Sequence, residues 1–159
     1  MIRPANDWDI PAIMDLLTQV LAVHNQGRPD IFKGKGYKYT PEELKGILRD
    51  EKAPVFVYTE ECPGGEKVLG HCFCQIIERP ERPSTYAYTT LYIDDLCVDE
   101  AARGKGVGRA LYDYAKQYAK DKGFFNVTLH AWECNPAAVG FYRSLGMEVQ
   151  SYTFEEVLK

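Results

Sequence analysis

Residues 95–111 read DLCVDEAARGKGVGRAL, and this stretch decides the fold. An apolar, strand-like run ends near Val98, glycines then alternate at positions 104, 106 and 108, and an amphipathic helix begins at Val107. Glycine permits positive φ angles and close backbone approach, so successive amide groups can point into one concavity. The start of the helix adds unpaired N–H groups and a partial positive charge. This strand–turn–helix unit therefore predicts a binding site for a diphosphate.

The charge around this turn also favours an anionic ligand. Residues 101–122 contain six Lys or Arg and two Asp, whereas the whole chain of 159 residues carries a net charge of −4. A basic patch on an acidic protein suits a small anion better than a nucleic acid. The turn is neither a P-loop, which needs Ser or Thr where Gly106 stands, nor a dinucleotide fingerprint, which needs Gly where Arg109 stands. A glycine-rich surface turn with solubilising charges is the alternative.

Hydrophobic periodicity along the rest of the chain predicts a mixed α/β or α+β fold. Helices are expected at residues 7–26, 40–53, 107–122 and 135–145. Strands are expected at residues 1–3, 55–59, 68–77, 86–98, 125–131 and 147–154. This order gives one mixed sheet with helices on both faces. Since no linker or repeat interrupts it and 159 residues is an ordinary domain length, we expect a single domain, 1–159.

Composition excludes several classes of protein. Hydrophobic residues make up 45% and charged residues 26%, which is close to the globular average and argues against disorder. No apolar run approaches the ~18 residues that a membrane span needs, and the charged first residues are unlike a signal peptide. The five cysteines, an odd number, then indicate free thiols in the cytoplasm. Cys72 and Cys74 lack a second pair of ligands, so no metal is expected.

Two segments resemble the signatures of the GCN5-related N-acetyltransferases, the GNAT family. Residues 103–108, RGKGVG, match its Arg/Gln-x-x-Gly-x-Gly/Ala signature, and residues 135–147, NPAAVGFYRSLGM, resemble its second signature. The resemblance spans nearly the whole chain, in the manner of a bacterial-type single-domain member. It implies the GNAT acyl-CoA N-acyltransferase fold, in which a mostly antiparallel central sheet contains one splayed pair of parallel strands.

The resemblance also implies an activity, the transfer of an acetyl group from the cosubstrate acetyl-CoA to a primary amine in a ternary complex. Acetyl-CoA would lie in the gap between the strands at 86–98 and 125–131. The residues implied to bind it are Leu96, Cys97, Val98, Arg103, Gly104, Lys105, Gly106, Val107, Gly108, Arg109, Asn135 and Tyr142. The N–H near Cys97 would polarise the thioester carbonyl. Asn135 either contacts the pantetheine arm or only caps the following helix.

The implied chemistry needs a proton donor and a proton acceptor. Tyr142 shares a helix face with Ala138 and Leu145, and the resemblance implies that its phenol protonates the departing CoA thiolate. An ammonium must lose a proton before it can attack, so a carboxylate base is expected at Asp95 or Asp94. We favour Asp95 as the base. The alternative is that its carboxylate only forms an ion pair with a neighbouring cation.

The acceptor pocket is implied to lie at the loop between the first two helices. The candidate substrate contacts are His24, Arg28, Phe32, Tyr37 and Asp94. For His24, however, its place on the apolar face of the first helix favours a hydrogen-bonded buried histidine over a base or a substrate contact. The acceptor would be a small-molecule amine or a peptide amine, and the enzyme a monomer or homodimer that contacts neither nucleic acid nor membrane. Two other functions stay open: a non-catalytic acyl-CoA-binding module, and a basic-patch module that binds polyanions.

Overall fold

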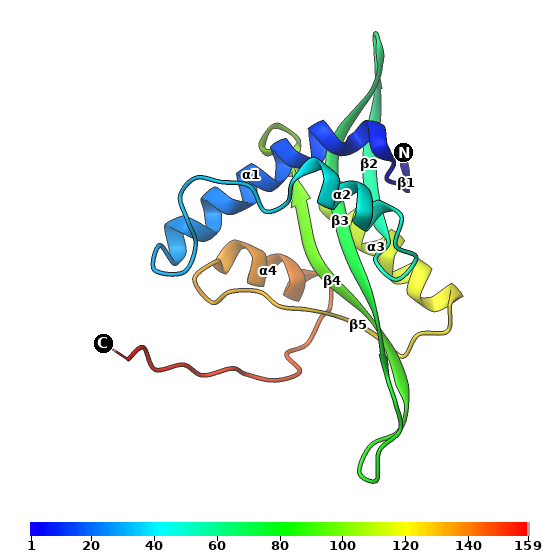
Figure 1. The fold of residues 1–159 in the computed structure, drawn as a ribbon, viewed down its shortest axis with the longest axis vertical. Helices are drawn as coiled ribbons and strands as arrows, with labels where there is room; N and C mark the ends of the chain where they lie inside the picture. Colours follow the sequence, from blue (N-terminus) through cyan, green and yellow to red (C-terminus); the bar gives the residue numbers. More distant parts are fainter. Residues whose placement is uncertain (159) are drawn as a thin grey trace.

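The computed structural model describes residues 1–158, whose strands form one five-stranded mixed sheet (Figure 1). In spatial order, the strands are β1 (Ile2–Pro4), β2 (Val55–Cys62), β3 (Gly65–Arg79), β4 (Tyr88–Val98) and β5 (Asn126–Leu129). Neighbours from β1 to β4 are antiparallel, whereas β4 and β5 are parallel. The expected mixed sheet with a single parallel pair is therefore confirmed.

Helices cover both faces of this sheet. They are η1 (Asp7–Asp9), α1 (Ile10–Gly27), α2 (Pro41–Leu48), η2 (Glu100–Ala102), α3 (Val107–Asp121) and α4 (Pro136–Ser144). One apolar cluster, which includes Ile13 and Leu44, joins α1 and α2 to one face, and a second, which includes Leu91 and Leu111, joins α3 to the other. No helix within residues 1–158 is long and apolar enough to cross a membrane.

Capping residues explain where two of the helices begin. The Thr40 hydroxyl accepts a hydrogen bond from the Glu43 amide, and the Glu43 carboxylate accepts one from the Thr40 amide, so α2 starts with a complete capping box. The helix ends at Leu48, earlier than the sequence suggested. At the start of α4, the Asn135 side chain accepts a hydrogen bond from the Ala138 amide. Asn135 therefore caps α4, which is one of the two roles expected for it; the other was a contact with the pantetheine arm.

The strand expected at residues 147–154 is wrong. Residues 147–158, called the trailing segment below, pair with no strand of the described chain. Figure 1 shows this segment, in red, leaving α4 and running as an extended trace away from the sheet. Its β-branched and aromatic residues, such as Val149 and Tyr152, have the strand propensity that motivated the expectation. Propensity does not supply a hydrogen-bonding partner, and none is present within the described residues.

A β-bulge interrupts β4 at Asp94. Asp95 and Ile93 pair with consecutive residues of β3, so Asp94 has no partner there. The extra residue shifts the alternation of side chains by one position. In a regular strand, Ile93 and Cys97 would point to the same face of the sheet. Here Ile93 packs in the cluster with α3, whereas the Cys97 thiol contacts the backbone of α1 on the opposite face. The bulge therefore turns Asp95 and Cys97 toward the α1 side of the sheet.

The two parallel strands pair only in part. Their register runs from Thr90 opposite Asn126 to Ile93 opposite Leu129, where β5 ends. Beyond that point no strand of residues 1–158 pairs with this edge of β4 from Asp94 to Val98. A bulge also bends a strand and increases its twist. The result is a gap beside the end of β4, which is the splayed pair that the sequence implied.

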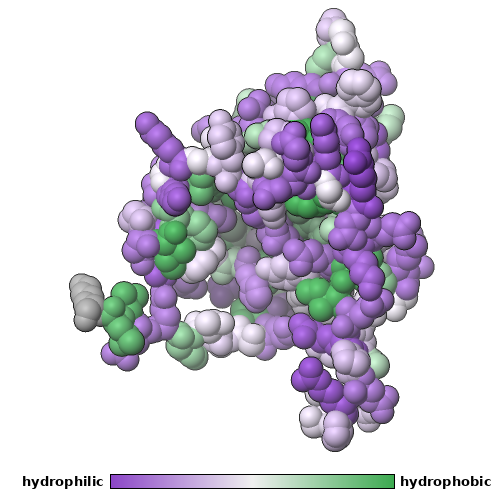
Figure 2. All heavy atoms as spheres, in the orientation of Figure 1, coloured by the Kyte–Doolittle hydropathy of each residue, from purple (hydrophilic) through white to green (hydrophobic). Residues whose placement is uncertain are grey.

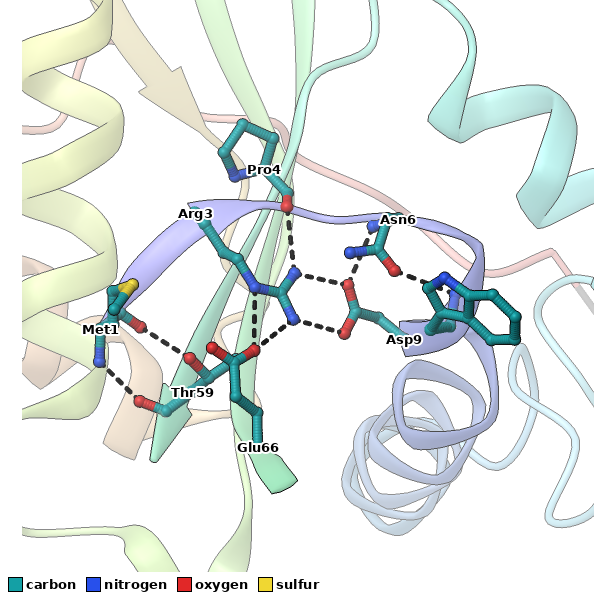
Figure 3. A network of polar contacts seen from close by, with 8 residues as sticks. Met1, Arg3, Pro4, Asn6, Asp9, Thr59 and Glu66 are labelled. Carbon is teal, nitrogen blue, oxygen red and sulfur yellow. Dashed lines mark hydrogen bonds and ion pairs between the residues drawn. The ribbon is translucent and has the colours of Figure 1, made fainter. Parts of the chain in front are cut away.

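An ionic network fixes the first residues of the chain to the sheet (Figure 3). The Arg3 guanidinium lies 2.8 Å from the Asp9 carboxylate and 2.7 Å from the Glu66 carboxylate. Asp9 also accepts a hydrogen bond from the Asn6 amide, and the Asn6 side chain accepts one from the Trp8 amide. Because each charge in this network has a partner of opposite sign, we assign it a structural role.

Candidate active site

A cavity of about 1060 Å³ lies between α1, the unpaired edge of β4, the glycine turn and α4. Figure 2 shows the surface hollowed between α1 and the trailing segment, with apolar side chains along the rim. Most of the site residues expected from the sequence line this cavity: His24, Phe32, Tyr37, Asp94, Asp95, Leu96, Cys97, Val98, Arg103, Gly104, Gly106, Val107, Gly108, Arg109, Asn135 and Tyr142. The fold thus brings the glycine turn, the paired aspartates and the helix of Tyr142 to one place.

Two of the expected site residues, Lys105 and Arg28, do not line the cavity. The Lys105 side chain is exposed on the outside of the glycine turn. The Arg28 guanidinium pairs with Asp30 at 2.7 Å and with Glu155, and it lies over the Trp132 ring. Its positive charge is therefore already compensated by two carboxylates, and the expected contact of Arg28 with the substrate stays a prediction.

The glycine turn presents free amides to the cavity. Gly104 and Gly106 have φ angles of 76° and 83°, the left-handed region that suits glycine, and a Cβ at either would meet no atom within 4 Å. Among the hydrogen bonds of the described chain, none uses the N–H groups from Gly104 to Arg109. The open space and the free N–H groups fit an anion such as a diphosphate at the start of α3.

Gly108 does not have a left-handed backbone, so glycine is needed there for another reason. A Cβ at Gly108 would lie 3.2 Å from the ring of Phe141 and 3.5 Å from the side chain of Val98. The start of α3 thus packs directly against α4 and the end of β4. A larger residue here would push apart the elements that border the cavity.

We expect Gly106→Val and Gly108→Val each to weaken CoA binding by at least about tenfold in calorimetry. Valine at Gly106 must adopt a left-handed backbone that β-branched residues avoid, and valine at Gly108 collides with Phe141. Gly46→Val is the matched control, because Gly46 lies in α2 with open space around it. A folded Gly108→Val protein with unchanged CoA affinity would exclude the glycine turn as the binding site.

An ion-pair cluster occupies the α1 side of the cavity. The Lys38 ammonium lies 3.1 Å from Asp94 Oδ2 and 3.2 Å from Asp95 Oδ2. Tyr39 contacts the same Asp94 oxygen at 3.5 Å. The bulge in β4 is the reason that two consecutive carboxylates reach one cation, since a regular strand would point them to opposite faces. A primary ammonium thus fits between Asp94 and Asp95.

Opposing effects act on the pKa of Asp95. Burial alone would raise it, because the charged form loses hydration. The hydrogen bond with His71 and the positive charge of Lys38 outweigh burial, and the net effect lowers the pKa of Asp95. At Lys38 burial is likewise outweighed, and the two aspartates raise the pKa of its ammonium. Asp95 is therefore an ionised carboxylate at neutral pH.

His71 holds the buried carboxylate of Asp95 from the neighbouring strand. Its Nε2 lies 3.3 Å from Asp95 Oδ1, while its Nδ1 is buried without a partner in residues 1–158. A hydrogen on Nε2 can be donated to the Asp95 carboxylate and thereby hold it in place. The Phe73 ring packs edge-on against His71, with 5.0 Å between the ring centroids. His71 is thus a positioning residue for Asp95.

His71 and Lys38 were not among the residues expected at the site. His71 carried a usable signal, because it is a single histidine inside an apolar strand run. Lys38 carried none, since it is one of several lysines in a loop and only the fold brings it to the aspartates.

The Cys97 side chain points away from reacting groups. Its thiol donates toward the Leu16 carbonyl oxygen of α1 at 3.5 Å. Burial raises the pKa of the Cys97 thiol to about 12, so the sulfur is not ionised at neutral pH. Any role of Cys97 in catalysis must therefore belong to its backbone, as the sequence had suggested.

Tyr142 is half-buried and lines the cavity from α4. Burial raises the pKa of its phenol, and the nearby Asp95 carboxylate adds to the effect. The hydroxyl therefore carries its proton throughout the neutral pH range and can donate it. Its ring packs beside that of Phe141, with 5.2 Å between the centroids.

Aromatic side chains form the wall of the cavity opposite the glycine turn. His24 packs on Phe32 with 4.8 Å between ring centroids, and Phe32 meets Trp132 edge-on at 5.3 Å. His24 is only partly buried, and no side-chain hydrogen bond from it is found within residues 1–158, so the expected hydrogen-bonded core histidine is wrong. Partial burial lowers the pKa of His24.

Comparison with known proteins identifies the family of the chain. A sequence model of the Acetyltransferase (GNAT) family matches residues 18–147. The chain belongs to this family. Among curated GNAT relatives, the uncharacterized N-acetyltransferase MJ1207 of Methanocaldococcus jannaschii is 41% identical over 121 residues, which cover 75% of this chain and 50% of that protein. The thialysine N-epsilon-acetyltransferase of Sus scrofa is 28% identical over 98 residues, covering 52% of this chain and 58% of that protein.

A solved structure extends the GNAT comparison to the whole fold. The tetramutant of the BH1408 protein from Bacillus halodurans superimposes with a TM-score of 0.93 at 33% identity, covering 99% of both chains. The GNAT chain described here spans only about half the length of the two curated relatives. The GNAT fold expected from the two signatures is thus confirmed.

Proposed function

We propose that the chain transfers an acetyl group from acetyl-CoA to a primary amine by direct attack in a ternary complex. One observation carries this proposal: a single cavity joins the free amides of the glycine turn, the unpaired edge of β4, the two aspartates and Tyr142. An acyl transfer between two bound substrates needs these four parts within reach of one another.

The residues around the glycine turn fit acetyl-CoA. The amides from Gly104 to Arg109 would hold the diphosphate, and the open space at Gly104 and Gly106 leaves room for its close approach. The unpaired edge of β4 near Cys97 would pair with the pantetheine arm. Bound there, acetyl-CoA supplies the activated acetyl group as a thioester.

The aspartates would receive the acceptor amine. An acceptor ammonium would replace the Lys38 ammonium between Asp94 and Asp95, and Asp95 would take its proton. The free amine would then form the new C–N bond as the C–S bond breaks. Tyr142 would give its proton to the departing CoA sulfur, and the second proton of the attacking nitrogen would leave as the amide forms and restore the Tyr142 phenol. The amide N–H groups of β4 near Cys97 would stabilise negative charge on the carbonyl oxygen.

The acceptor is proposed as an amine with an apolar body, of small-molecule or peptide origin. The aromatic wall of His24, Phe32 and Trp132 supports an apolar contact beside the aspartates. A relative named for acetylating thialysine, an amino acid with a primary amine, supports a primary amine as the reacting group. Three of the five cysteines are buried as unbridged thiols, which fits a reducing compartment such as the cytoplasm.

A thiol-release assay tests the proposed function. The protein is incubated with acetyl-CoA and a panel of primary amines, including polyamines, lysine analogues and peptides with free N-termini. We expect at least one amine to release CoA thiol catalytically. Tight CoA binding in calorimetry with no turnover on any amine would favour the non-catalytic acyl-CoA-binding module. Salt-sensitive RNA binding without CoA affinity would favour the polyanion-binding module.

A further inference from the structure

The loop between α1 and α2 places a primary ammonium of the chain itself in the candidate active site. In Figure 1 this loop returns from the end of α1, passes the end of β4 and leads into α2. The Lys38 nitrogen lies 3.1 Å from Asp94 Oδ2 and 3.2 Å from Asp95 Oδ2. The Lys38 ammonium therefore occupies the position proposed above for the ammonium of an acceptor.

This contact distinguishes Lys38 from the other two lysines of the cavity. Lys33 and Lys35 also line it, but neither forms an ion pair within residues 1–158. The Lys38 side chain is 36% exposed, so its nitrogen lies at the wall of an open cavity and not in the core. Lys38 thus has both access to a bound ligand and a carboxylate in contact that can take its proton.

The backbone around Lys38 leaves room for its nitrogen to move. Within residues 1–158, no backbone–backbone hydrogen bond involves residues 33–39. Gly36 has a φ of 140°, and a Cβ there would meet no atom within 4 Å. The loop is fixed before this stretch, where the Asn25 side chain donates to the Phe32 carbonyl oxygen at 2.7 Å. A flexible four-carbon side chain on such a loop can turn toward a thioester in the same cavity.

We infer that Lys38 is a self-acetylation site, at which the chain acetylates its own side chain when acetyl-CoA is bound and no acceptor amine is present. The inference rests on the proposed function, because it uses the same base and the same acid. Asp95 takes one proton from the ammonium, the Lys38 nitrogen bonds to the acetyl carbon, and the C–S bond breaks. Tyr142 protonates the sulfur, and the second nitrogen proton restores its phenol. The products are an N-acetylated lysine, CoA thiol and the proton on Asp95.

The modification removes the positive charge that fills the ammonium site. An acetylated lysine is neutral and no longer forms ion pairs, so Asp94 and Asp95 become free to receive an external ammonium. Before modification, burial would lower the pKa of the Lys38 ammonium, but the charges of Asp95 and Asp94 outweigh burial and raise it. Because the free amine is scarce, we expect self-acetylation to be slow and to occur once per chain.

The experiment incubates the 159-residue chain with saturating acetyl-CoA alone and follows its intact mass. We expect one added acetyl group per chain, which peptide mass spectrometry locates on Lys38. Lys38→Arg keeps a cation beside the aspartates but no primary amine, and it should gain no acetyl group. Lys35→Arg is the matched control and should be acetylated like wild type. Asp95→Asn should slow the reaction by at least about tenfold. Circular dichroism verifies that each variant is folded.

The kinetics show whether the reaction occurs within one molecule. Its rate constant should not change when the protein is diluted about tenfold, since a reaction between molecules would slow in proportion. An acetyl group present before incubation supports the inference when the Asp95→Asn protein lacks it, and otherwise overturns it.

Three results would overturn self-acetylation of Lys38. The first is a protein that acetylates an amine of the panel but never Lys38, which leaves the proposed function intact. The second is equal acetylation of Lys33, Lys35 and Lys38, or a rate that Asp95→Asn does not alter, because either indicates uncatalysed acetylation by acetyl-CoA. The third is a rate that falls with dilution. A protein that acetylates neither Lys38 nor any amine contradicts the proposed function together with this inference.

Discussion

We expect Tyr142→Phe to lower kcat by about 10²–10⁴ while leaving the affinity for acetyl-CoA unchanged. The substitution keeps the ring that packs beside Phe141 and removes only the hydroxyl that faces the cavity. Burial raises the pKa of this phenol, so wild-type protein holds the proton ready across the neutral range. Steady-state turnover with an amine from the thiol-release screen, together with calorimetry for acetyl-CoA, measures both quantities.

Tyr114→Phe is the matched control for that measurement. Tyr114 lies on α3 and packs edge-on against Phe56 in the core, away from the cavity. Its variant should turn over at the wild-type rate. If Tyr142→Phe also stays within a factor of about two of wild type with chemistry limiting, Tyr142 is a packing residue and the thiolate takes its proton from another donor.

The second large effect is expected at Asp95. Asp95→Asn preserves the size of the side chain and an oxygen that accepts from His71, but it removes the group that would take the acceptor's proton. We expect kcat/KM to fall by about 10²–10⁴. Glu78→Gln makes the same chemical change in an exposed ion pair with Lys52 and should have no effect on turnover.

The pH profile separates Asp95 from the acceptor itself. Because the folded protein lowers the pKa of Asp95, its carboxylate stays ionised until the pH falls below the ordinary aspartate range. Any rise of kcat/KM between about pH 6 and 9 should therefore reflect the amine, and Asp95→Asn should lower the curve without moving that rise. A larger loss in Asp94→Asn than in Asp95→Asn would transfer the role of base to Asp94.

The sequence could predict much of the arrangement of the glycine turn and Tyr142 at the cavity. The glycine turn is a local feature, because the glycines, the basic residues and the start of α3 lie within a few residues of one another. The helical spacing that turns Tyr142 inward is equally local. Local patterns of this kind predict structure well, because few contacts between distant parts of the chain are needed to form it.

The acceptor side depends on contacts between distant parts of the chain. Lys38 reaches Asp94 and Asp95 across more than fifty positions of sequence, and no local pattern indicated that pairing. The face of Asp95 could not be derived from alternation, because a bulge has no reliable signature in one sequence. The trailing segment had the right propensity for a strand, but a strand is defined by its partner.

Because Asp94 is the extra residue of the bulge, a mutation can delete it and leave Asp95 in place. Deleting the Asp94 codon would join Ile93 directly to Asp95, and regular alternation would then keep each on the face that it occupies now. Deleting Ile93 instead would press Asp94 into the apolar cluster beneath α3. Gain or loss of a single codon at this one position is thus an evolutionary route by which a lineage can change the charge of the proposed acceptor pocket without rebuilding the sheet.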